Sequence, residues 1–86
     1  MDSHSDQELV QRMASGDPDA FTGLYRRHQA AVYRFALQMS GSQTVAEDVV
    51  QEVFLTLMRE TAVYDAGRGA LGPFLYGIAR NHVRRR

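Results

Sequence analysis

Hydrophobic residues recur at helical spacing through most of this 86-residue chain, and the clearest repeat lies at residues 44–60. At 100° per residue its apolar positions share one broad arc; they are Ala46, Val49, Val50, Val53, Phe54 and Leu57. The opposite face is polar except for Leu55, with Met58 at its edge. Thr44 followed by Glu47 is typical of a capping box, so we predict that the helix begins there.

Leu55 needs an explanation, because a leucine on the polar face cannot pack into the core that the same helix covers. Its neighbours on that face include Asp48, Gln51 and Glu52. One interpretation is a single exposed leucine, which is common on protein surfaces. The other is that this mixed polar and apolar face contacts a partner. The pattern alone leaves both interpretations open.

The same spacing predicts three more helices, one short and two long, at about residues 6–15, 18–40 and 71–86. Ser5 and Glu8 form a second possible capping box, and Asp17 followed by Pro18 is a typical helix start. Glycines follow the first two helices, as they do at many helix ends. No stretch shows the alternation of a strand. We therefore predict an all-α fold, a compact bundle of four helices, one short and three longer.

We expect the three longer helices to pack around a core rich in aromatic side chains, formed by Phe21, Phe35, Val53, Phe54, Leu57, Phe74 and Ile78. The apolar stripe of the second helix includes Tyr25, and His28 lies in its middle. A lone histidine there is better interpreted as a hydrogen-bonded residue at the core edge than as a ligand. Tyr33 and Leu37 form a second, small apolar patch on that helix, outside the stripe. Residues 1–5 are expected to be a flexible tail ahead of a single domain at residues 6–86.

Composition excludes several classes of function. The chain has no cysteine, hence no disulfide, no thiolate metal site and no cysteine nucleophile. It has no Gly-rich phosphate loop, and its three histidines fall in three different elements. We therefore expect no enzyme activity, no metal and no cofactor. No long apolar run and no signal peptide are present, so we expect a cytoplasmic protein that does not insert into membranes.

Charge is unevenly distributed, although the formal net charge is zero. Residues 1–65 carry all ten acids and five arginines, a balance of −5, whereas residues 66–86 carry five arginines and no acid, a balance of +5. Aromatic residues lie among these C-terminal arginines, a combination typical of single-stranded nucleic-acid binding. The pattern singles out Tyr64 and Arg68, in an expected loop at residues 61–70, and Tyr76 and Arg80, on the expected outer face of the last helix. Arginines in a last helical turn also complement the helix dipole without any ligand, and that alternative stays open.

Three segments, GDPDAFTGLYRRH, AEDVVQEVFLTL and FLYGIARN, in this order and spacing, resemble region 2 of bacterial sigma factors. In particular they resemble the extracytoplasmic-function (ECF) group of the sigma-70 family. The resemblance covers the chain from about Asp6 to Arg86. Its most specific part is AEDVVQEVF followed about twenty residues later by FLYGIARN.

The resemblance implies that the helix at residues 44–60 binds the clamp coiled coil of the polymerase β′ subunit. In the family this helix carries a D-x-x-Q-E pattern. The matching positions are Asp48, Gln51 and Glu52, with Leu55 and Met58 beside them. On this interpretation Leu55 is buried only in the complex.

The resemblance also implies that the loop and the last helix recognise and melt the promoter −10 element, with a base of the non-template strand flipped into a protein pocket. The implied DNA-binding residues are Tyr64, Arg68, Tyr76, Arg80, Asn81 and Arg84. Two positions at this end depart from the family's pattern. Many members carry Trp where Phe74 stands, and Asp is frequent where this chain has Arg85.

The implied partners are core RNA polymerase, through its β′ subunit, the −10 non-template strand of promoter DNA, and an anti-sigma factor. The chain itself is expected to be a monomer. We expect the C-terminal region 4, which would read the −35 element, to lie outside these 86 residues. The last helix also carries no terminating signal, so we expect a fragment of a longer protein.

Two other functions stay open. One is a stand-alone helical DNA-binding regulator of duplex DNA, which would need a short recognition helix in the major groove. The other is a protein-interaction module bound by an anti-sigma factor. The Tyr33/Leu37 patch and the face that carries Leu55 are the candidate surfaces for such a partner.

Overall fold

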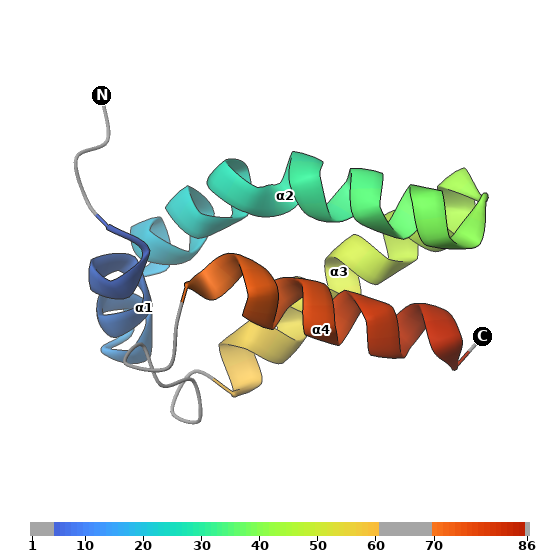
Figure 1. Cartoon of the computed structure of the whole chain (residues 1–86). Coiled ribbons are helices and arrows are strands. Elements are labelled where there is room, and N and C mark those ends of the chain that lie inside the picture. The colour runs from blue at the N-terminus through green and yellow to red at the C-terminus, as the bar shows by residue number, and fades with distance from the viewer. Residues whose placement is uncertain (1–4, 61–69, 86) are drawn as a thin grey trace.

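The computed structural model describes residues 5–60 and 70–85, and within them it contains four α-helices and no strand. The helices are α1 (Asp6–Ala14), α2 (Pro18–Ser40), α3 (Gln43–Arg59) and α4 (Leu71–Arg84). Helices α2 and α4 run side by side, α3 packs against both of them, and α1 lies at the end where α2 begins (Figure 1). The predicted all-α bundle of one short and three longer helices is confirmed.

Short polar side chains and glycine define the ends of the first two helices. Ser5 Oγ accepts a hydrogen bond from the Glu8 N–H at 3.2 Å, and Asp17 Oδ1 accepts one from the Asp19 N–H at 3.0 Å. Gly41 ends α2 with a φ of 69°, a left-handed conformation that glycine adopts at little cost. The predicted bounds of α2 are therefore confirmed. Of the predicted tail, residues 1–4 lie outside the described residues, and Ser5 is the N-cap of α1.

The start of α3 differs from the prediction. Ser42 is the N-cap, and its Oγ accepts a hydrogen bond from the Val45 N–H at 3.2 Å. Thr44 lies inside the first turn of the helix instead of capping it. The chain enters α3 directly after the left-handed Gly41, because a serine hydroxyl in the next position already satisfies a free N–H of the first turn.

The centre of the core is aliphatic, and most of the predicted aromatic residues lie at its edge. The largest fully buried side chains are Leu24, Leu57, Leu71, Leu75, Val32, Val49 and Val53. Phe54 is buried as predicted, whereas Phe21, Phe35, Phe74 and Ile78 are only partly buried around the core. Alanines that are completely buried, at positions 36, 46 and 79, leave no room for large rings where the helices approach one another.

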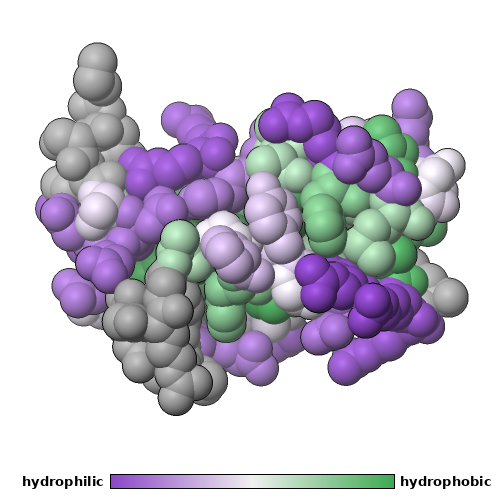
Figure 2. Space-filling view, viewed as in Figure 1, coloured by the Kyte–Doolittle hydropathy of each residue, from purple (hydrophilic) through white to green (hydrophobic). Residues whose placement is uncertain are grey.

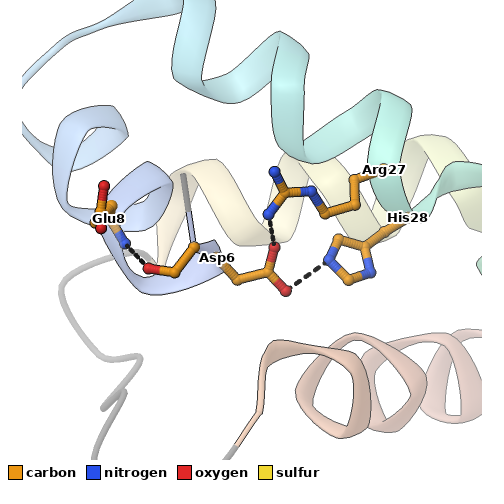
Figure 3. A network of polar contacts seen from close by, with 5 residues as sticks. Asp6, Glu8, Arg27 and His28 are labelled. Carbon is orange, nitrogen blue, oxygen red and sulfur yellow. Dashed lines mark hydrogen bonds and ion pairs between the residues drawn. The ribbon is translucent and has the colours of Figure 1, made fainter. Parts of the chain in front are cut away.

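Helix α1 is tied to α2 through the carboxylate of Asp6. One oxygen lies 2.7 Å from Arg27 Nη1 and the other lies 2.9 Å from His28 Nε2 (Figure 3). His28 is half-buried. The prediction that it is a hydrogen-bonded residue at the core edge is confirmed. The inner face of α1 adds Leu9 and Val10, both buried, to the core.

Candidate functional site

The outward face of α3 carries the residues that the sequence singled out. Asp48, Gln51, Leu55 and Met58 are exposed, and Glu52 is half-buried. Leu55 is 48% exposed and Met58 is 52% exposed, so two large apolar side chains lie in water on a helix whose other face is buried. The predicted helical phase is confirmed. Whether a partner covers this face stays a prediction.

An apolar groove of about 340 Å³ adjoins this face, between α2 and α3. Its lining residues are Phe21, Tyr25, Gln51, Phe54 and Leu55. The Phe54 ring lies at the centre of an aromatic group, with ring centroids 5.0 Å from Tyr25 and 6.4 Å from Phe21. The two outer rings therefore extend the apolar surface of Leu55 onto α2.

Tyr25, like Phe21, is a residue of this groove that sequence reasoning placed too deep in the core. Its spacing put it in the inner stripe of α2, yet it is 37% exposed. Its ring covers Phe54 at the outer edge of the helix interface instead of entering the core. The signal that could have indicated this is the phenol itself, since a buried Tyr hydroxyl needs a polar partner.

Helix α4 carries exposed Arg80 and Arg84 in one row, and exposed Asn81 lies beside that row on the flank toward α3. Figure 2 shows the strongly hydrophilic surface over the C-terminal half of this helix. Among the described residues neither of these arginines forms an ion pair. Their exposure agrees with the prediction, and their charges are available to a ligand.

Tyr76 does not stand on the outer face as predicted. It is half-buried, and its ring centroid lies 5.0 Å from that of Phe35 on α2, with 33° between the ring planes. Helix α2 is long enough for Phe35 to reach Tyr76, which makes this ring part of the α2–α4 packing. Only part of the ring is left for stacking on a base. Tyr64 and Arg68 lie outside the described residues.

One further predicted feature differs in the structure. Tyr33 and Leu37, predicted as a separate apolar patch, are partly buried and packed against the core. Within residues 5–60 and 70–85, no group of three or more His, Cys, Asp or Glu side chains could hold a metal ion. None of the described helices has the length and apolarity needed to cross a membrane.

Comparison with known proteins agrees with the sequence motifs. The family model for sigma-70 region 2 matches residues 24–86. The ECF RNA polymerase sigma factor BldN of Streptomyces coelicolor is 37% identical over 82 residues, which cover 95% of this chain and 31% of BldN. The RNA polymerase sigma factor CarQ of Myxococcus xanthus is 35% identical over 75 residues, 87% of this chain and 42% of CarQ. The ECF RNA polymerase sigma factor SigL of Mycobacterium tuberculosis is also 35% identical over 75 residues, 86% of this chain and 42% of SigL.

The chain thus spans between about a third and two fifths of the length of these relatives. No solved structure matches it significantly. The family match covers well over half of the chain and includes α3, α4 and most of α2. The chain belongs to the sigma-70 region 2 family, within the ECF group of sigma factors.

Proposed function

We propose that this chain is the part of a transcription initiation factor that binds core RNA polymerase through α3 and recognises and melts the promoter −10 element through α4 and the preceding loop. The observation that carries the proposal is the outward face of α3. Leu55 and Met58 are about half exposed there, in a domain of the sigma-70 region 2 family. The chain would bind the polymerase and the DNA without any covalent step. The proposed location is the cytoplasm.

The α3 face has the composition of a binding surface. Leu55 and Met58 would leave water on docking, which contributes roughly 25 cal/mol per Å² of apolar area. Gln51 can donate and accept hydrogen bonds at the rim of the groove. The carboxylates of Asp48 and Glu52 favour a partner helix that carries cations. We propose the clamp coiled coil of the β′ subunit as that partner.

The α4 face suits a single DNA strand. Arg80 and Arg84 would neutralise backbone phosphates, and the amide of Asn81 can pair with a base edge. Tyr76 would contribute the exposed part of its ring, and Tyr64 and Arg68 would contribute from the segment that precedes α4. A flipped base costs a few kcal/mol of stacking energy, and contacts inside the protein would offset that cost.

The observations give less support to the rival functions. A duplex-reading regulator needs a short recognition helix that enters the major groove. Helix α4, the helix proposed to bind DNA, is instead packed against both α2 and α3. An anti-sigma factor fits better as a regulator that covers the α3 face than as an alternative function. The Tyr33/Leu37 surface is a weaker candidate for it, because both side chains already pack on the core.

The proposal is tested by the binding of the chain to purified core RNA polymerase, and to the β′ clamp coiled coil alone. We expect Leu55→Arg to abolish binding and Gln51→Ala to weaken it. Met39→Arg is the matched control, because Met39 is a 40% exposed apolar residue on α2 outside the groove. Binding that Leu55→Arg leaves unchanged would remove α3 from the interface. No binding by the folded wild-type chain would refute the proposed function.

A further inference from the structure

A polar cleft of about 230 Å³ lies between the C-terminal half of α3 and the inner flank of α4. Its polar lining residues are Thr56, Arg59, Glu60, Asn81, His82 and Arg85. Of these, only Asn81 belongs to the DNA-binding residues predicted from sequence. The cleft brings together side chains from two helices that lie more than ten residues apart in the sequence.

The cleft holds two arginines and a single carboxylate. Arg59 donates from Nη2 to Thr56 Oγ1 at 3.3 Å, a partly buried contact that orients its guanidinium group. A guanidinium has five N–H donors, so this bond leaves several of them for a ligand. Arg85 forms no ion pair with any described residue, and Glu60 forms none either. The excess of donors over acceptors favours an anion.

Phosphate is the anion that suits these donors. The planar fork of an arginine binds two phosphate oxygens at once, and two arginines on opposite walls can hold one group from both sides. The amide of Asn81 adds a neutral donor beside them. Arg85 is the C-cap residue of α4, four residues after Asn81, and its backbone N–H donates to the Asn81 carbonyl. The two residues therefore continue one row along the helix, next to the row of Arg80 and Arg84.

This arrangement gives a strand a continuous path. A backbone that passes the exposed row of Arg80 and Arg84 meets Asn81 next and then the cleft. Arg85 supplies the positive charge on the α4 wall of the cleft, opposite Arg59 on the α3 wall. We propose that the α3–α4 cleft binds a backbone phosphate of a single DNA strand, with Arg59 and Arg85 as its charged ligands. This inference rests on the proposed function, because the phosphate belongs to the DNA that α4 is proposed to bind.

The experiment measures binding of the 86-residue chain to a fluorescein-labelled single-stranded oligodeoxynucleotide by fluorescence anisotropy over a range of NaCl concentrations. We expect Arg85→Gln and Arg59→Gln each to lower the slope of log K against log salt by about 0.7, the value for one phosphate contact on a single strand. Arg26→Gln is the control. It removes the same charge from an exposed position on α2 and should leave the slope unchanged. Circular dichroism verifies that each variant keeps its helices.

A second measurement follows the Asn81 side-chain amide by NMR during a titration with inorganic phosphate. Phosphate that shifts this signal in the wild-type chain, but not in Arg85→Gln, supports an anion site in the cleft. If phosphate shifts the signal in this way but Arg85→Gln leaves the salt slope of DNA binding unchanged, the cleft binds free phosphate. That result would overturn the assignment to DNA. If phosphate does not shift the Asn81 signal and Arg85→Gln does not change the DNA slope, the cleft binds no phosphate and the proposal is overturned.

The two proposals fail in different ways. If the slope responds to Arg80→Ala and Arg84→Ala but not to the cleft variants, the cleft proposal is overturned and the proposed function stands. If the folded wild-type chain binds neither the oligodeoxynucleotide nor core polymerase, both are overturned.

Discussion

Tyr25 and Phe54 contact each other edge to face across the α2–α3 interface, with 5.0 Å between ring centroids and 62° between ring planes. The two partners have unequal surroundings, since Phe54 is 2% exposed and Tyr25 is 37% exposed. The same ring contact therefore joins the core on one side to the apolar groove on the other.

Truncating the two rings should have unequal effects on stability. Phe54→Ala leaves a cavity in the core and should lower the free energy of unfolding by about 3–5 kcal/mol. Tyr25→Ala should lower it by about 1 kcal/mol, close to the value of one aromatic pair. Urea unfolding followed by circular dichroism measures both. Equal losses would mean that the Tyr25 ring is buried as deeply as that of Phe54.

Two leucines on α3 provide a test of its orientation. Leu57 is fully buried, and Leu57→Ala should cost about 2–5 kcal/mol of stability. Leu55 is half exposed, and Leu55→Ala should change stability by less than about 0.5 kcal/mol. The same substitution at two positions of one helix makes each variant the control of the other. A large loss at Leu55 would contradict the exposed position of its side chain.

The start of α3 can be tested by removing one hydroxyl at a time. Ser42→Ala removes the acceptor of the Val45 N–H and should cost about 1 kcal/mol. Thr44→Ala should cost less, since Thr44 is exposed within the first turn and alanine favours helix. Thermal unfolding of both variants measures the difference. A larger loss for Thr44→Ala would restore the start predicted from sequence.

Asp6 should control how firmly α1 is held. Asp6→Asn removes the charge that faces Arg27 and His28, and should weaken the docking of α1 by about 1 kcal/mol, because these side chains are only partly shielded from water. Amide hydrogen exchange should then be about fivefold faster in α1 while the amides of α3 keep their protection. Uniformly faster exchange in both helices would instead mean that the contact stabilises the whole fold.

The exposed arginines of α4 should each add one phosphate contact. Arg80→Ala and Arg84→Ala should weaken binding of single-stranded DNA and lower its salt slope by about 0.7 each. Arg34→Ala, at an exposed position on α2, is the control for net charge. The readout is the anisotropy titration at several salt concentrations. A variant with the wild-type slope would exclude that arginine from the DNA interface.

Much of the fold could be predicted from the sequence, because the signals that define it are local. Helical periodicity placed Leu55 on the outside of α3, and Asp17, Pro18 and Gly41 marked both ends of α2. Capping chemistry is less discriminating. Ser42 and Thr44 carry equivalent hydroxyls two residues apart, and only the backbone conformation decided between them.

Features that depend on contacts between helices could not be predicted from the hydrophobic pattern of the sequence. The burial of Tyr76 depends on Phe35 in α2, and the exposure of Tyr25 depends on Phe54 in α3. A hydrophobic pattern gives the direction in which a side chain points from its own helix, but not how far the neighbouring helix covers it. The α3–α4 cleft is of the same kind, since its donors converge only after the two helices pack.

Only Gly41 and Ser42 separate α2 from α3. Closing so short a connection costs little chain entropy, and single helices form within about a microsecond. We therefore expect these two helices to associate first during folding, with α1 and α4 docking afterwards, as in other fast-folding helical chains with mainly local contacts. The face that carries Leu55 would then exist early on the folding pathway, before the arginine-rich surface of α4 has taken its place.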